Sequence, residues 1–434
     1  MSKIIHLKKA EMESIERVLR RAQTDISKIE QDVRKIIEDV KTKGDIAIIE
    51  FYKKMLNIEI DVKIHEDEFE KARERVSREF IEALEFGSDN IREFHRMQKP
   101  KPWMYEMRRG IYVGQIVRPI ESVGVYIPGG KAAYPSTALM TVIPAMEAGV
   151  KRIVATTPPD NDGSINPHVL TALDFLGVKE AYRVGGAHAV AAMAFGTESV
   201  PKVNKIFGPG GIWFTAAKML VRDSVDIDFI AGPSEILILA DETADPKYIA
   251  LDLISQLEHD VSTSAVLVTT SEAIAEKVDR IMSELIEKVE RAEIVKKAYG
   301  EYGAIVVASD LDEAVAFANE YAPEHLEIHV SPEKIIDVLS KVNNAGSIFI
   351  GKYAPVPLGD YVLGPNHVLP TGGWAKARGG LSILDYLKII DVAYVEPSVL
   401  PELGKHLKVL AGFEGLVNHY KAVEARIDNP ENRS

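Results

Sequence analysis

Four residues of the kinds that hold a divalent metal lie far apart in this chain. A carboxylate–imidazole pair stands among them and could supply acid/base groups. Amide oxygen, imidazole nitrogen and carboxylate form a mixed N/O donor set, which suits zinc or a similar first-row metal better than calcium. The residue types therefore point to metal-assisted chemistry with proton transfer. The four candidate ligands are Gln256, His259, Asp360 and His419, and the pair is Glu324-His325.

Gln256 and His259 fall in the segment 249–259, where apolar residues such as Leu253 and Leu257 repeat at helical spacing. Residues three apart on a helix are neighbours on one face, so the pattern predicts a helix that presents both polar side chains together. Taken alone, a Gln-x-x-His step fits the polar face of a surface helix better than a metal site.

Three other segments could carry chemistry. Glu324 and His325 follow a predicted helix and precede a predicted strand, and a histidine near its ordinary pKa of about 6.5 is a natural proton acceptor. Asp360 lies in a long loop, 357–373, that is rich in turn residues, and loops of that length are more often functional than idle. The segment 413–419 reads as the opening of a helix with Glu414 and His419 about one and a half turns apart, although an ordinary acidic helix start explains it equally.

Composition limits the classes of protein to consider. A chain of 434 residues is too long for one ordinary core, so two or more domains are expected. The net charge of −13, with no basic cluster, gives nucleic acid no electrostatic footprint. There is neither a membrane-length apolar run nor a signal peptide's apolar region, so we expect a soluble, cytoplasmic protein without a membrane partner. Zero cysteines exclude disulfides, thiolate ligands and a cysteine nucleophile.

Buried strands alternating with helices dominate the chain after a charged helical region at 8–98. Such alternation is typical of parallel sheets in an α/β protein. Two series of strands follow one another, and helices at 272–291 and 310–320 fit as crossovers in the second series. The first series is 123–126, 152–156, 181–184, 205–207 and 235–240, and the second is 264–269, 303–307, 326–330 and 346–350.

Glycine-rich turns follow three strands of the first series, at 126–131, 184–188 and 207–211. Glycine at a strand-to-helix turn lets backbone N–H groups approach an anion, which is how nucleotide phosphates are commonly held. None of the three matches the phosphate-loop pattern or the G-x-G-x-x-G dinucleotide pattern. Tight turns beneath a parallel sheet explain each of them about as well as ligand binding does.

Six dispersed motifs, taken together and in order, resemble the histidinol dehydrogenase family over about residues 20–425. The resemblance implies an NAD-dependent, zinc-dependent enzyme that oxidises L-histidinol through L-histidinal to L-histidine, the last steps of histidine biosynthesis. The motifs are the 126–140 stretch with Pro128-Gly129-Gly130 and Tyr134-Pro135-Ser136, Ala231-Gly232-Pro233-Ser234-Glu235, Ser255-Gln256-x-Glu258-His259, Ala322-Pro323-Glu324-His325, Gly359-Asp360-Tyr361 through Asn366-His367-Val368-Leu369-Pro370-Thr371, and Glu414-Gly415-Leu416-x-x-His419.

By this resemblance each subunit would hold one Zn²⁺, and His325 would act as general base while Glu324 activates water. Family members are homodimers in which the C-terminal segment crosses to the partner, so Glu414 and His419 would complete the other subunit's site. The implied zinc ligands are Gln256, His259, Asp360 and His419, and these four would line the substrate together with Ser234, His325 and Glu414.

The resemblance also implies the fold: two incomplete Rossmann-like domains, one inserted in the other, with small N- and C-terminal helical segments. The expected division has four parts. They are an N-terminal segment at 1–22, a first domain at 23–125 plus 236–375, an inserted domain at 126–235, and a C-terminal segment at 376–434 that is exchanged with the dimer partner.

Two positions depart from the family pattern at the expected NAD site. The family usually has Gln and Asn where this chain has His188 and Gly211, whereas Tyr126 is retained. Histidine can still donate a hydrogen bond, but glycine has no side chain to do so. Two other readings stay open: a family relative that oxidises another small polar alcohol with the same zinc and Glu-His groups, and a non-enzymatic nucleotide- or metal-binding protein.

Overall fold

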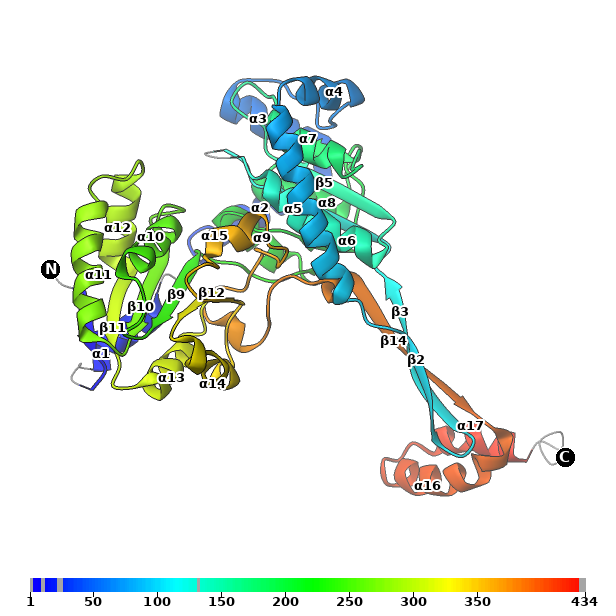
Figure 1. Ribbon diagram of the computed structural model, residues 1–434. Helices are drawn as coiled ribbons and strands as arrows, with labels where there is room; N and C mark the ends of the chain where they lie inside the picture. Colours follow the sequence, from blue (N-terminus) through cyan, green and yellow to red (C-terminus); the bar gives the residue numbers. More distant parts are fainter. Residues whose placement is uncertain (1–2, 9–11, 22–25, 131–132, 429–434) are drawn as a thin grey trace. The chain divides into compact units, whose positions relative to one another are not determined.

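The computed structural model describes residues 3–8, 12–21, 26–130 and 133–428 (Figure 1). The chain forms two compact units. The first comprises Met1–Gln98 and Glu121–Asp385, and the second comprises Lys99–Ile120 and Tyr386–Ser434. Two parallel sheets with their helices make up the first unit, which gives the α/β class that the strand–helix alternation predicts.

A six-stranded parallel sheet forms one half of the first unit. Its order is β1-β11-β10-β9-β12-β13. Strands β9, β10 and β11 are largely apolar on both faces, because helices cover the sheet from both sides. The strands are β1 (Ile4–His6), β9 (Glu235–Ala240), β10 (Ser264–Thr269), β11 (Gly303–Val307), β12 (His325–His329) and β13 (Ser347–Ile350).

The alternation of side chains along each strand decides which helices the two faces meet. On β9, Ile236 and Ile238 pack with α10, α11 and α12, whereas Leu237 and Leu239 pack with α1, α13 and α14. Figure 1 shows α10, α11 and α12 on one side of this sheet and α13 and α14 on the other. These helices are α1 (Met12–Arg20), α10 (Pro246–Leu257), α11 (Glu272–Leu285), α12 (Ala292–Tyr302), α13 (Leu311–Tyr321) and α14 (Ile335–Lys341).

A five-stranded parallel sheet, ordered β6-β5-β4-β7-β8, forms the other half of the first unit. Helices α2, α3, α8 and α9 share one apolar core with it, and α6 packs on β4. Gly124 on β4 leaves room for Met193 of α8, whose sulfur would collide with any Cβ there. The strands are β4 (Ser122–Tyr126), β5 (Arg152–Thr157), β6 (Ala181–Arg183), β7 (Lys205–Phe207) and β8 (Asp226–Ile227).

The helices around the five-stranded sheet include the charged N-terminal ones. Helix α5 packs on α6, α6 on α7, and α4 on α7. Their bounds are α2 (Glu30–Lys43), α3 (Asp45–Leu56), α4 (Glu66–Glu74), α5 (Arg78–Met97), α6 (Pro135–Ala148), α7 (Pro167–Phe175), α8 (Gly186–Phe195) and α9 (Ile212–Leu220).

The second unit contains an antiparallel sheet, ordered β14-β3-β2, and two helices that pack on each other. The bounds are β2 (Trp103–Arg108), β3 (Ile111–Pro119), β14 (Leu387–Val395), α16 (Leu400–Phe413) and α17 (Val417–Ile427). Short helical turns complete the described residues: α15 (Val356–Tyr361) and the 3₁₀ turns η1 (Pro332–Lys334), η2 (Trp374–Lys376), η3 (Ile383–Tyr386) and η4 (Pro397–Val399).

Two expectations about elements are wrong, and one sheet was missed. Strand 235–240 closes the first predicted series but pairs with β10 and β12 of the six-stranded sheet. The helix predicted over 272–291 ends at Leu285, because residues 286–291 leave the helical conformation in turns before α12. The antiparallel strands of the second unit were not foreseen, since all six residues of β2 are exposed and show no apolar alternation.

Candidate active site

The predicted catalytic pair opens strand β12. Glu324 precedes the strand and His325 is its first residue, and both are buried. Ser234, which is half-buried, immediately precedes the neighbouring strand β9. Since β9 and β12 are parallel and His325 pairs with Ile236, these residues lie together at the amino-terminal edge of the six-stranded sheet.

The backbone of one residue, Glu235, holds both members of the pair. Its carbonyl oxygen accepts a hydrogen bond from His325 Nδ1 at 2.9 Å, and its N–H donates to Glu324 Oε2 at 2.7 Å. His325 Nε2 is buried, and the described residues offer it no hydrogen-bond partner. It lies 3.8 Å from Asp360 Oδ1, too far for a hydrogen bond. One imidazole nitrogen is therefore fixed and the other is free to act.

Charges around His325 oppose the effect of its burial. Burial lowers the pKa of His325, but the negative charge of Glu324 and then that of Asp360 raise it well above the usual value. The sequence does not reveal this effect, because it does not show two carboxylates beside one buried ring. Burial raises the pKa of Asp360, yet His325, and then the charges of His367 and His259, bring it below its ordinary value.

Asp360 lies in the short helix α15, and its side chain is 17% exposed. The sequence placed it in a loop, but the segment begins with a helical turn from Val356 to Tyr361. The carbonyl oxygen of Asp360 accepts a hydrogen bond from His367 Nδ1 at 2.9 Å. His367 is thus a support for Asp360 that sequence reasoning quoted without giving it a role.

Gln256 and His259 differ in their surroundings. Gln256 is buried in the last turn of α10, whereas His259 is exposed and lies two residues beyond the helix end at Leu257. The predicted helix over 249–259 is therefore too long. The His259 N–H still donates to the Gln256 carbonyl at 3.2 Å, so the chain continues the turn. The positive charge of His259 is among the causes that lower the pKa of Asp360.

A buried ion pair supports this edge of the sheet. Glu235 Oε2 lies 2.8 Å from Arg21 Nη1, and Glu235 Oε1 accepts a hydrogen bond from the Gly372 N–H at 2.7 Å. Burial raises the pKa of Glu235 to about 7, although the Arg21 charge opposes the rise. In the sequence analysis Glu235 was only a member of a motif, and Arg21 was missed. Together they tie the strand that anchors His325 to the loop at Gly372.

Glu414 and His419 belong to the second unit, and both are exposed. They do not share one helix start, as the sequence suggested. Glu414 caps the end of α16, Gly415 adopts a left-handed conformation with φ of 75°, and α17 begins at Val417. That turn separates the two side chains into different elements. The predicted ligands thus divide between units, with three in the first and His419 in the second.

The residues expected at NAD follow the carboxyl ends of β4, β6 and β7 in the five-stranded sheet. Tyr126 ends β4; its ring stacks on Phe214 at 4.0 Å, and its hydroxyl accepts a hydrogen bond from the Gly186 N–H at 3.4 Å. Helix α8 begins at Gly186, and Gly211 caps the start of α9. Tyr126 of the 126–131 turn thus contacts the 184–188 turn through this hydrogen bond. Lys131 of the first turn lies outside the described residues.

The two departures from the family pattern differ in structure. The His188 side chain is buried, and its ring packs on Phe51 with the centroids 4.1 Å apart. Burial lowers the pKa of His188 to about 4, so the ring is neutral at physiological pH. Gly211 is exposed, with φ of −66°, and a Cβ there would meet nothing within 4 Å. Neither space nor conformation requires glycine at that position.

Comparison with known proteins identifies the chain's relatives. The model of the histidinol dehydrogenase family matches residues 19–427. The chain belongs to the histidinol dehydrogenase family. It is 48% identical to histidinol dehydrogenase of Methanothermobacter thermautotrophicus, across 95% of this chain and 97% of that one. It is 47% identical to that of Methanopyrus kandleri, across 97% and 99%. The crystal structure of histidinol dehydrogenase from Elizabethkingia anophelis is 35% identical, with a TM-score of 0.94 and 98% of both chains covered.

Membership in the histidinol dehydrogenase family confirms the resemblance read from the six motifs, the α/β fold class and the expectation of an enzyme. The chain is an oxidoreductase, and the family's reaction is a step of histidine biosynthesis. Among the described residues, we find no helix that combines the length and the apolar character needed to cross a membrane.

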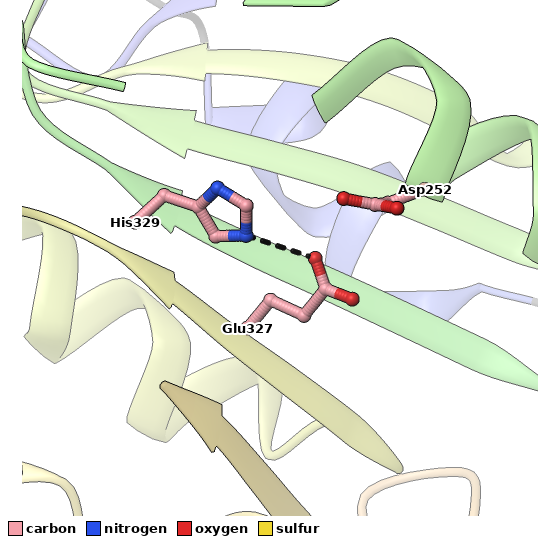
Figure 2. A group of neighbouring side chains, drawn as sticks. All are labelled: Asp252, Glu327 and His329. Carbon is pink, nitrogen blue, oxygen red and sulfur yellow. Dashed lines mark hydrogen bonds and ion pairs between the residues drawn. The ribbon is translucent and has the colours of Figure 1, made fainter. Parts of the chain in front are cut away.

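A group of three polar side chains near this site, two buried and one half-buried, was missed by sequence reasoning. The ligand-type atoms of Asp252, Glu327 and His329 lie within 4.8 Å of one another (Figure 2). None of the three belongs to the predicted zinc set. One signal was available: in the sequence of β12, from His325 to His329, polar residues alternate with apolar ones although the whole strand is buried.

Proposed function

We propose that the chain oxidises L-histidinol through L-histidinal to L-histidine, with two hydride transfers to NAD and one zinc ion in each site. Membership in the histidinol dehydrogenase family supports the substrate. The observation that carries the proposal is the state of His325. Its Nδ1 is fixed on the Glu235 carbonyl, while its buried Nε2 lacks a partner among the described residues and faces Asp360. A cation held by Asp360 would offset the carboxylate charge that raises the pKa of His325, and this nitrogen would then accept the proton of a reacting hydroxyl group.

The proposed zinc ligands are Gln256, His259 and Asp360 of one chain and His419 of a second copy. Their donor set is the borderline N/O type that zinc accepts. The partly open carboxylate of Asp360 beside an unpartnered imidazole nitrogen leaves polar groups for an ion and substrate to satisfy. Bound there, zinc would orient the amino and imidazole nitrogens of histidinol.

His325 would take the proton of the substrate hydroxyl as the carbinol hydrogen leaves as hydride to NAD, which forms the C=O bond of histidinal. Glu324 would then assist the addition of water to the aldehyde, and loss of a second hydride would give the carboxylic acid. Ser234 would contact the bound substrate, and the Glu414 carboxylate suits the substrate's cationic amino group. Two NAD molecules are reduced for each histidinol.

The NAD proposal rests on Tyr126, His188 and Gly211. These positions follow parallel strands at their carboxyl ends, where helices α8 and α9 begin. Backbone N–H groups at helix starts are suited to phosphate oxygens, and open α/β sheets bind ligands at these ends.

A homodimer is the proposed assembly, with the C-terminal segment 376–434 of the proposed domain division reaching the partner's site. Its support is the apolar surface of the second unit. Phe413 is 90% exposed, Leu410 is 65% exposed, and Val409 and Val417 are each 57% exposed. Apolar side chains gathered in this way usually mark an interaction site.

Stoichiometry of NAD reduction tests the reaction. We expect two NADH for each L-histidinol, loss of activity on chelation, and recovery with zinc. His325→Ala should lower kcat by roughly 100-fold or more, in line with removal of a general base. A substrate panel of other small polar alcohols tests the alternative within the family. One NADH per alcohol, with free aldehyde captured by a trapping reagent, would contradict the proposal.

Subunit mixing tests the shared site. His419→Ala and Glu324→Gln should each be inactive alone. After the two variants are unfolded and refolded together, each heterodimer would contain one complete site, so activity should return to about a quarter of the wild-type value. A site built within one chain would give no recovery from the mixture.

A further inference from the structure

Strand β12 turns a row of polar side chains toward helix α10. Glu327 pairs with Ile238 of β9, and His325 with Ile236. Residues paired across parallel strands point to the same face, and Ile236 and Ile238 pack in the core that α10 covers. Leu326 and Ile328 occupy the opposite face. His325, Glu327 and His329 therefore share the α10 side of the sheet.

Glu327 is completely buried and has polar partners on three elements. Its Oε1 accepts a hydrogen bond from the Val356 N–H of α15 at 2.8 Å, and its Oε2 lies 3.1 Å from His329 Nε2 on β12. The ligand-type atoms of Asp252 on α10 lie within 4.8 Å of those of Glu327 and His329. Figure 2 shows the Asp252 carboxyl and the His329 ring directed toward the Glu327 carboxylate.

Hydrogen-bond chemistry fixes the roles in this group. Two ionised carboxylates this close together in a buried place repel each other, so one of them holds a proton. Burial, and then the charge of Glu327, raises the pKa of Asp252 to about 8, so Asp252 is the O–H donor at neutral pH. Glu327 then accepts hydrogen bonds from the His329 Nε2–H and the Val356 N–H, with the protonated Asp252 carboxyl beside it. The His329 Nδ1 is buried without a hydrogen-bond partner among the described residues.

Two neighbours of Glu327, and Glu327 itself, lie two to four residues along the chain from a residue of the candidate site. Asp252 lies four residues before Gln256 on α10, which is one helical turn on the same face. Val356 begins α15, four residues before Asp360. Glu327 itself lies two residues after His325 on β12. Its carboxylate thus joins the three elements that carry two proposed zinc ligands and the proposed base.

We propose that Glu327, with Asp252 as its proton-carrying partner, is a positioning residue that sets Gln256, Asp360 and His325 relative to one another. This inference rests on the proposed function, because it concerns how the proposed zinc site is held. The three side chains do not themselves hold a metal in this proposal. The Glu327 oxygens already have partners in the Val356 N–H and the His329 Nε2–H, and a cation would have to displace them.

Matched substitutions distinguish the loss of a hydrogen-bonding group from the loss of side-chain volume. Asp252→Asn keeps a donor where protonated Asp252 has its O–H, whereas Asp252→Ala removes it. Glu327→Ala removes all three contacts. Asp241→Asn is the control, because Asp241 is equally buried and its carboxylate accepts from Ser331 and Lys334, which belong to no part of the proposed site.

Zinc affinity of the full-length protein, measured by competition with a chelating dye, is the main measurement. Cobalt substitution gives an absorption spectrum that reports ligand geometry. We expect Glu327→Ala and Asp252→Ala to weaken zinc binding by about 10- to 100-fold, as loss of supporting hydrogen bonds does at other metal sites. Asp252→Asn should stay within about twofold of the wild type. Asp241→Asn should lower the melting temperature and leave the affinity and the cobalt spectrum unchanged.

Two outcomes would overturn the inference. One is wild-type zinc affinity and an unchanged cobalt spectrum in folded Glu327→Ala. The other is a second zinc ion per wild-type chain that Glu327→Ala loses, which would make the group a metal site instead. Failure of the proposed function looks different, because the wild-type protein itself would then neither bind zinc nor reduce NAD with L-histidinol.

Discussion

The structure predicts that His188 makes the folded protein less stable as the pH falls below about 6.5. The pKa of this buried ring is lowered from 6.5 to about 4, so the unfolded chain binds the proton first as the pH falls. The stabilising contribution of the neutral ring is complete above about pH 6.5 and is lost between pH 6.5 and pH 4. Proton linkage gives a loss of roughly 2 kcal/mol between pH 7 and pH 5, and at most about 3 kcal/mol by pH 4.

His188→Gln removes the titrating group and replaces it with the residue that the family usually has. Loss of the contact with Phe51 also changes the free energy of unfolding at pH 7, so the informative quantity is the difference between pH 7 and pH 5. Urea unfolding of wild type and variant at both pH values gives that double difference. We expect the variant to lose about 2 kcal/mol less than the wild type on acidification. His406→Gln, at an exposed position of the second unit, serves as control.

Hydrogen exchange at amides of α3 and α8 gives the same comparison locally, which matters because a chain of two units need not unfold in one step. Equal acid sensitivity in the wild type and in His188→Gln would refute the reasoning. So would a loss of stability on the alkaline side, since that requires a raised pKa in the folded protein.

Two further perturbations concern the five-stranded sheet. Gly211→Asn should tighten NAD binding several-fold in a titration. The Asn side chain can also cap α9, which lacks a side-chain cap. Equal NAD affinity in Gly211→Asn and Gly211→Ala would show that the amide makes no cofactor contact. Lys218→Met should lower the free energy of unfolding by about 3–5 kcal/mol, measured by thermal unfolding. Lys218 pairs with buried Asp228, so loss of the ammonium group leaves that carboxylate without its counter-charge below the Gly208 turn. A melting temperature within a degree or two of the wild type would contradict this account.

Local sequence determined the strands of the two parallel sheets but not their grouping. Runs such as 264–269 and 303–307 coincide with β10 and β11, because a strand buried on both faces is apolar throughout. For the same reason the run 235–240 could be assigned to either sheet. Only its pairing with β10 and β12 decides the matter. Pairing depends on contacts between distant segments, which a local pattern does not encode.

The candidate site divides in a similar way. Residue types and the family motifs identified Glu324, His325 and Asp360, and the structure sets these three side chains together. The supports around them were not visible in the sequence. The anchoring groups on Glu235 are its backbone atoms, which every residue has. Glu327 gains its partners from the register of β12 against β9 and from the start of α15.

The two departures from the family pattern fall on one sheet, and the acid/base groups fall on the other. His188 and Gly211 follow strands of the five-stranded sheet, whereas Glu324 and His325 open a strand of the six-stranded sheet. The first group presents helix starts and glycine turns, and the second is a buried polar arrangement that depends on exact hydrogen bonding. Substitution at His188 or Gly211 can therefore alter cofactor affinity while the proton-transfer groups keep their partners. Within the proposed function, we expect substitutions at His188 or Gly211 to change the KM for NAD. Substitutions at Glu324 or His325 should lower kcat.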